Sequence, residues 1–181
     1  MIDNPRSPRV RAVAKLAKRE ARSQTGLFLL EGPQAVSEAL TFRPELIVDL
    51  FATPTALERH PGIAAAAAEA DLEVEFVTEQ VVEAMADTVT PQGVVAVCRQ
   101  FPTSVKDILA GQPKLIAILE EVRDPGNAGT IIRAADAAGA DAVIFTGRSV
   151  DLYNPKVVRA TTGSLFHLPV AVDNELESVI E

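Results

Sequence analysis

Residues 124–140 read DPGNAGTIIRAADAAGA and join a predicted buried strand to a helix. The apolar run LIAIL at 115–119 is typical of a strand buried on both faces, and Pro125 with Gly126 disfavours further strand pairing. A second apolar run follows at 142–145. Strand, helix and strand in this order predict a β-α-β unit with parallel strands, whose ligands gather at the carboxyl end of the first strand.

The helix of this unit carries two polar residues that suit a site. Apolar residues recur after Ala128 with a helical period, and Gly139 is the residue type that commonly ends a helix. Asn127 lies at the strand exit, and Arg133 follows about a turn and a half into the helix. Because long helical side chains point back toward the helix start, we expect Arg133 to reach the same crevice as Asn127.

The first hundred residues alternate short strands and helices. Strand-like runs lie at 27–30, 46–51, 72–77 and 94–98, and helical segments lie at 33–40, 63–70 and 79–85. This order predicts a small α/β sandwich. Pro102, Gly111 and Pro113 make 101–113 the best linker, so we expect one domain at 1–100 and another at 114–181.

The composition is that of a globular protein. Hydrophobic residues make up 48% of the 181 residues, and no apolar run approaches the ~20 residues that a membrane span needs. The first residues lack an apolar signal region, so we expect a cytoplasmic protein with no membrane partner. Cys98 is the only cysteine and lies in an apolar run, which predicts a buried thiol. His60 and His167 are isolated, and the absence of metal-ligand spacing predicts no metal site.

The net charge of -8 conceals a basic amino terminus. Residues 1–22 hold seven basic and two acidic residues, a balance of +5, and the remainder holds ten basic and 23 acidic residues, a balance of -13. On one helix that starts near Ser7 or Pro8, four cations at spacings of four, three and four form one stripe: Arg11, Lys15, Lys18 and Arg22. A phosphate backbone fits such a stripe. The alternative is a solvated helix face that serves solubility alone.

Three segments, in order along the chain, resemble one family. The NAGTIIR core at 127–133, with residues 120–126 before it, resembles the first signature motif of the SpoU (TrmH-like) branch of the SPOUT RNA methyltransferases. Residues 151–169, DLYNPKVVRATTGSLFHLP, resemble the segment that follows in that family, and LFLLEGPQAVSEA at 27–39 resembles its RNA-binding domain. The resemblance implies an RNA 2′-O-ribose methyltransferase that uses S-adenosylmethionine. It is most similar to ribosomal RNA enzymes of the thiostrepton-resistance type, which implies 23S ribosomal RNA as the partner.

The same resemblance implies the fold and a departure from it. We expect a sandwich like that of small ribosomal proteins that bind kinked RNA, followed by the first part of a Rossmann-like SPOUT (trefoil-knot) domain. Two further family motifs, built around Gly-x-Glu-x-x-Gly and Ser-Leu-Asn-Val, do not occur before Glu181. We therefore expect a fragment without the knot, with most of its cofactor site beyond Glu181. Residues 173–181 are expected to begin a helix capped by Asp173 or Asn174, and the homodimer of full-length members to be weak or absent here.

The resemblance assigns the catalytic role to Arg133 and a positioning role to Asn127. A guanidinium gives up its proton only at great cost, so fixing the target phosphate and stabilising a developing alkoxide is an easier role for Arg133 than general base. Each residue also has an ordinary structural alternative. Asn127 suits a helix cap, and Arg133 suits an ion pair with Asp136 three residues on.

Further RNA contacts are expected at Asn154, Lys156 and Arg159, which open a second short helix, and at Glu31, which resembles a recurrent family position. The alternatives are surface charges at Lys156 and Arg159, and a hydrogen bond to backbone by Glu31. Three other functions stay open: a non-catalytic RNA-binding module, a transfer RNA ribose methyltransferase, and a nucleotide-binding Rossmann enzyme. The glycine spacing argues against the last, because it does not form G-x-G-x-x-G.

Overall fold

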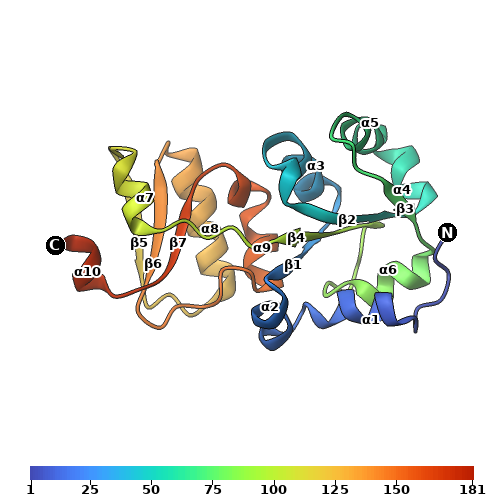
Figure 1. The fold of residues 1–181 in the computed structure, drawn as a ribbon, viewed down its shortest axis with the longest axis horizontal. Helices are drawn as coiled ribbons and strands as arrows, with labels where there is room; N and C mark the ends of the chain where they lie inside the picture. Colours follow the sequence, from blue (N-terminus) through green and yellow to red (C-terminus); the bar gives the residue numbers. More distant parts are fainter. The chain divides into compact units, whose positions relative to one another are not determined.

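The chain divides after Gln100 into two units, Met1–Gln100 and Phe101–Glu181, in a computed structural model that describes all of residues 1–181 (Figure 1). The first unit is built on a mixed sheet of four strands in the order β1-β4-β2-β3. These are β1 (Leu27–Glu31), β2 (Ile47–Ala52), β3 (Val74–Phe76) and β4 (Val94–Arg99). β4 pairs antiparallel with β1 and β2, and β2 pairs parallel with β3. Each of the four predicted strands is present, and β3 is shorter than expected.

Helices cover both faces of this sheet. α1 (Pro8–Lys15) and α6 (Glu79–Met85) lie on one face, and α3 (Pro33–Phe42) and α5 (Pro61–Glu69) lie on the other (Figure 1). The unit also contains α2 (Arg19–Thr25), the 3-10 turn η1 (Pro44–Leu46) and α4 (Pro54–Arg59). On the α1 and α6 face, Val10, Val81 and Met85 pack with Phe51 and Val97 of the sheet. The predicted α/β class is confirmed.

The prediction of a single amino-terminal helix is wrong. α1 ends at Lys15, and α2 begins at Arg19 after Lys18 has adopted an extended backbone. Leu16, at the turn between the helices, is only 3% exposed. The chain bends here because the bend lets Leu16 join the core beside α1 instead of continuing the helix.

Three parallel strands in the order β5-β6-β7 form the sheet of the second unit. They are β5 (Ile116–Glu120), β6 (Ala142–Thr146) and β7 (Val170–Asn174). Its helical elements are α7 (Val105–Ala110), α8 (Pro125–Ala137), α9 (Pro155–Thr161), η2 (Ser164–Phe166) and α10 (Leu176–Ile180). The predicted β-α-β unit is β5, α8 and β6, with parallel strands as expected.

Two expectations for this unit do not hold. β5 is an edge strand with one neighbour, and Leu115 and Ile118 keep 50% and 41% of their surface exposed, so the strand is not buried on both faces. α10 starts at Leu176 after an extended Glu175, because β7 continues through Asp173 and Asn174, which therefore do not cap it.

The expected linker at 101–113 lies within the second unit. Ile108 of α7 packs in a core cluster with Ile144 and Ala171. The Phe101 ring stacks on Phe166 with 5.7 Å between centroids, and its backbone N–H donates to the Tyr153 hydroxyl at 2.8 Å. The apolar residues of this segment, rather than its prolines and glycine, decide where it lies.

The prediction that Cys98 is a buried thiol is confirmed. It lies on β4 with 0% exposure, and burial raises the pKa of its thiol to about 12. None of the helices has both the length and the apolar character needed to cross a membrane.

Gly129 allows α8 and α9 to pack closely. A Cβ added there would lie 2.4 Å from the Cβ of Ala160 and 2.6 Å from the carbonyl oxygen of Val157. Both distances are far shorter than an ordinary van der Waals contact of about 3.5–4.0 Å. Any larger residue must push the two helices apart.

We expect Gly129→Ala to destabilise the second unit by about 2 kcal/mol, because overpacking a tight contact outweighs the usual helix preference for alanine. Thermal unfolding followed by circular dichroism measures this as a lower Tm. Gly62→Ala in α5 is the matched control, since a Cβ there meets nothing within 4 Å. Equal Tm values for the two variants would contradict the close-contact argument.

Candidate nucleic-acid and catalytic site

The loops that follow β5 and β6 are bonded to each other at the carboxyl edge of the sheet. The Glu121 N–H donates to the carbonyl of Thr146 at 3.0 Å, and the Val150 N–H donates to the carbonyl of Val122 at 2.7 Å. The Ser149 hydroxyl donates to the Thr146 carbonyl at 2.8 Å and accepts from the Val122 N–H at 3.2 Å. This network holds the start of α8 beside the end of β6.

Asp124, and not Asn127, caps α8. Oδ1 of Asp124 accepts the backbone N–H of Asn127 at 2.8 Å, and Pro125 occupies the first helical position, where no amide donor is needed. The capping alternative for Asn127 is therefore wrong. Its carboxamide is exposed near the carboxyl end of β5 and makes no hydrogen bond within the chain.

Arg133 is exposed on α8 and has no hydrogen bond or ion pair within the chain. The predicted alternative, an ion pair with Asp136, does not form. Oδ2 of Asp136 instead lies 2.6 Å from Nδ1 of His167, just after η2. The guanidinium therefore keeps all its donors, which is what a phosphate or an alkoxide requires of it.

The residues expected to contact RNA near α9 have different roles in the structure. Asn154 caps the helix, because its Oδ1 accepts the Lys156 N–H at 3.0 Å. Lys156 points into solvent from the first turn, and Arg159 is half-buried in the last turn. Lys156 is the most accessible cation of this helix.

The basic stripe of the first unit keeps three of its four members. Arg11, Lys15 and Lys18 are exposed, and the two lysines line a hollow of about 250 Å³ beside α2. Arg22 is only 2% exposed and its guanidinium Nη1 donates to the carbonyls of Leu16 and Ala17 at 3.0 and 2.9 Å. Its prediction as an RNA contact is wrong, because the break after α1 leaves carbonyls that need a buried donor.

Arg9, which the stripe did not include, is held by the sheet. It forms ion pairs with Glu75 at 2.7 Å and Asp49 at 2.8 Å, and it lies 5.3 Å above the Phe51 ring. The side-chain hydrogen bond to Glu75 is the main reason that the pKa of Arg9 is raised. These contacts hold α1 on the sheet.

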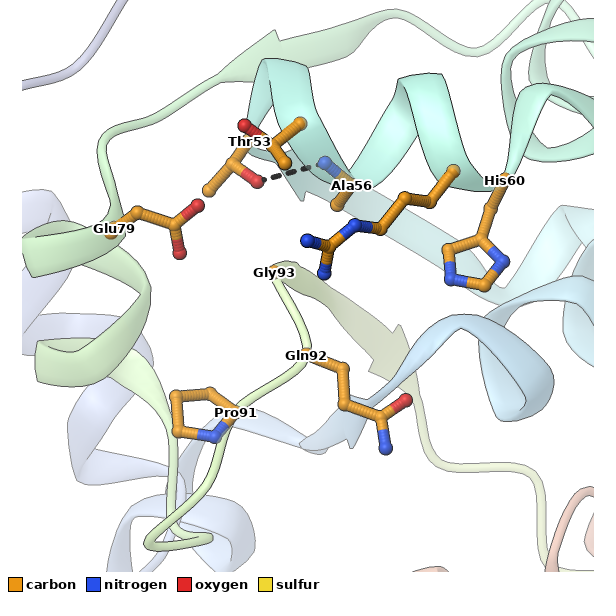
Figure 2. A pocket seen from close by; sticks show the side chains of 9 residues that line it. Thr53, Ala56, His60, Glu79, Pro91, Gln92 and Gly93 are labelled. Atoms are coloured by element: carbon orange, nitrogen blue, oxygen red, sulfur yellow. Dashed lines mark hydrogen bonds between the residues drawn. The ribbon is translucent and has the colours of Figure 1, made fainter.

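Glu31 also forms hydrogen bonds with backbone N–H groups. Its Oε1 accepts the backbone N–H groups of Asp87 at 2.9 Å and Thr88 at 3.3 Å. The structural alternative for Glu31 is therefore present, because Glu31 holds the segment between α6 and β4, and its RNA contact stays a prediction. That segment forms one wall of a polar groove that the sequence did not reveal (Figure 2). Its residues come from separate helices and loops, so no local motif points to it.

The roles of Arg22 and Lys18 separate stability from RNA binding. We expect Arg22→Ala to lower the free energy of unfolding by about 2 kcal/mol, because one buried and one partly buried carbonyl lose their donor. Lys18→Ala should leave stability unchanged and weaken binding to a labelled ribosomal RNA hairpin, since it removes one cation from the surface. Urea unfolding and fluorescence anisotropy measure the two effects. A loss of stability for Lys18→Ala alone would reverse these assignments.

The fold and these positions define a two-unit α/β protein with free polar groups at the carboxyl edge of a parallel sheet. Family models match both units: residues 114–181 match the SpoU rRNA Methylase family, and residues 7–96 match the MRM3-like substrate binding domain. The chain belongs to the SpoU rRNA methylase family.

Known proteins that are similar to nearly the whole chain agree with this family assignment. The 23S rRNA (guanosine(2553)-2′-O)-methyltransferase RlmP of Bacillus subtilis is 34% identical over 177 residues, which cover 96% of this chain and 65% of that protein. The human rRNA methyltransferase 3, mitochondrial, is 32% identical, with 97% of this chain and 42% of that protein covered. A crystal structure of the AdoMet-bound rRNA methyltransferase from Sinorhizobium meliloti superposes with a TM-score of 0.83 at 32% identity, over 99% of this chain and 66% of that one. The chain thus spans just under two thirds of the length of RlmP.

Proposed function

We propose that this chain provides the RNA-recognising part and the catalytic arginine of a ribosomal RNA 2′-O-ribose methyltransferase that uses S-adenosylmethionine. The observation that carries the proposal is the free state of Asn127 and Arg133 on α8. Asp124 caps α8, and His167 pairs with Asp136. Neither Asn127 nor Arg133 is therefore used to hold the fold. The two side chains belong to one helix that begins at the carboxyl edge of the sheet, where α/β proteins bind ligands.

Arg133 acts by charge and position. A ribose 2′-hydroxyl is a poor nucleophile, and alignment of the reacting groups can supply about 7–11 kcal/mol of the barrier. An arginine guanidinium stays protonated in proteins, so Arg133 fixes the target phosphate and stabilises the developing alkoxide rather than accepting the hydroxyl proton. Asn127 orients the ribose through its amide. Lys156 supplies a further phosphate contact.

The methyl donor supplies a group that is already activated as a sulfonium. The side chains of Arg133 and Asn127 offer a guanidinium and an amide, which suit a phosphate and a ribose. The one buried polar atom here without a partner is Oγ1 of Thr146 at the end of β6.

Ribosomal RNA is the favoured substrate. The names of the Bacillus subtilis and Streptomyces viridochromogenes relatives specify guanosine 2553 and uridine 2479 of 23S rRNA. The match of residues 7–96 to a substrate-binding domain and the exposed cations of α1 support RNA recognition by the first unit. A purely RNA-binding role is the second candidate, favoured by the same cations because they need no cofactor. The cytoplasm is the proposed compartment.

Removal of the Arg133 guanidinium should slow methyl transfer far more than it weakens RNA binding. In the protein joined to the rest of its family domain, we expect Arg133→Ala to slow methylation of 23S rRNA by at least about 100-fold, because an oxyanion loses its stabilising donor. Transfer from tritiated S-adenosylmethionine measures the rate, and anisotropy measures RNA affinity. Arg43→Ala in the first unit, which removes an arginine that forms a surface ion pair with Glu45, is the control. Full activity of Arg133→Ala would refute the catalytic assignment.

A homodimer is proposed for the full-length protein and a monomer for residues 1–181. The exposed apolar side chains of the β5 segment and α8 are Leu115, Ile118 and Ile131, and a stable interface uses roughly 20–30 residues on each side. Three such side chains make only a small apolar patch on this unit. We expect the 19.3 kDa chain to sediment as a monomer at micromolar concentration. A species that sediments with about twice the monomer mass would contradict this expectation.

A further inference from the structure

A polar groove lies at the carboxyl end of β2 in the first unit (Figure 2). It has a volume of about 260 Å³ and is lined by residues along α4 from Thr53 to His60, by Glu79 at the start of α6 and by the segment that leads into β4. A second hollow of about 320 Å³ adjoins it and shares His60 and Gln92 with it, while adding Gln34 and Ser37 of α3. Because the two hollows share lining residues, we refer to them together as the His60 groove.

The walls of the His60 groove are held by backbone contacts. Gly93, at φ +83°, lies so close to α4 that an added Cβ would be 2.8 Å from both the Cβ of Ala56 and Oγ1 of Thr53. The Thr53 N–H donates to the Gly93 carbonyl at 2.9 Å, and the Thr53 hydroxyl accepts the Ala56 N–H at 3.2 Å. Glu31 anchors the other end of the same segment at residues 87 and 88. The groove is therefore formed before any ligand arrives.

The side chains that line the groove have unused hydrogen-bonding groups. Those of Gln34, Ser37, Thr55, Arg59, His60 and Gln92 make no hydrogen bond or ion pair within the chain. Two amides, two hydroxyls and an imidazole offer donors and acceptors together. Charge is balanced, because Arg59 is opposed by Glu79. A surface that binds only the phosphate backbone needs an excess of cations, which this lining does not have. The lining instead suits a ligand that has both hydrogen-bond donors and acceptors on a flat edge.

We propose that the His60 groove receives one unpaired nucleobase of the RNA substrate, with Gln34 and Gln92 reading its edge. Specific RNA recognition targets bases in loops and bulges, whose edges are free for hydrogen bonds. The proposal rests on the proposed RNA methyltransferase function and adds to it the point where the substrate is recognised. Arg11, Lys15 and Lys18 then supply the general attraction to phosphates, and the His60 groove supplies the preference for an unpaired base.

The test compares two labelled RNAs of equal length with the full 181-residue chain: a 23S rRNA hairpin that spans guanosine 2553 with its loop unpaired, and a fully paired duplex. We expect the Gln34→Ala, Gln92→Ala double variant to bind the loop RNA about tenfold more weakly, from two lost hydrogen bonds, while its duplex affinity stays within twofold. The slope of affinity against salt should not change, because both substitutions are neutral.

Two further variants make the result specific. Gln92→Glu keeps the side-chain size and replaces the amide donors, so it should also lose the loop preference. Gln80→Ala, on α6 and outside the groove, should behave as the wild type. Equal loop affinity of the double variant and Gln80→Ala would overturn the groove proposal while wild-type RNA binding upholds the proposed function. Wild-type protein that binds neither RNA would overturn both.

Discussion

The close approach of α8 and α9 at Gly129 is the contact on which the arrangement of the second unit depends. With a Cβ-sized group excluded by Ala160 and Val157, the two helices lie against each other at backbone distance. α8 carries Asn127 and Arg133, and α9 begins one residue after Asn154. The relative position of these residues is set by packing, not by their own bonds to one another. A site that must hold an RNA ribose in line for transfer needs this kind of rigid support.

The polar residues near both sites separate into two groups. Asp124, Glu31, Arg22 and Asn154 satisfy backbone groups at a helix start, a loop or a helix break. Asn127, Arg133, Lys156 and the two glutamines of the His60 groove, Gln34 and Gln92, have no such task. Because buried backbone groups must find partners, the first group is required by the fold, and it frees the second group for ligands.

Sequence patterns predicted most elements of the fold, and the errors share one cause. The strand and helix periods located the β-α-β unit and the four strands of the first unit, because burial on a regular element repeats in the sequence. The apolar run of β5 did not show that this strand would have one neighbour, since strand order is a property of the whole sheet. Helical spacing placed Arg22 on a surface stripe, whereas the turn at Leu16 rotates it into the interior. Local periodicity contains no information on where the chain bends to bury a distant residue.

The candidate site was predictable where it follows one short motif and hidden where it does not. Asn127 and Arg133 lie within seven consecutive residues, so the sequence alone identified them and the class of chemistry that they suit. The structure decided that Asp124 caps the helix and that Asp136 pairs with His167, which leaves both residues free. The His60 groove is made by residues from 34 to 92 that meet only when β2 and β4 pair and α3, α4 and α6 pack around them. The sequence by itself therefore determined the β-α-β chemistry, because its residues are neighbours along one helix. Only tertiary structure decided which polar groups are free and where the groove forms, because both depend on contacts between residues far apart in the chain.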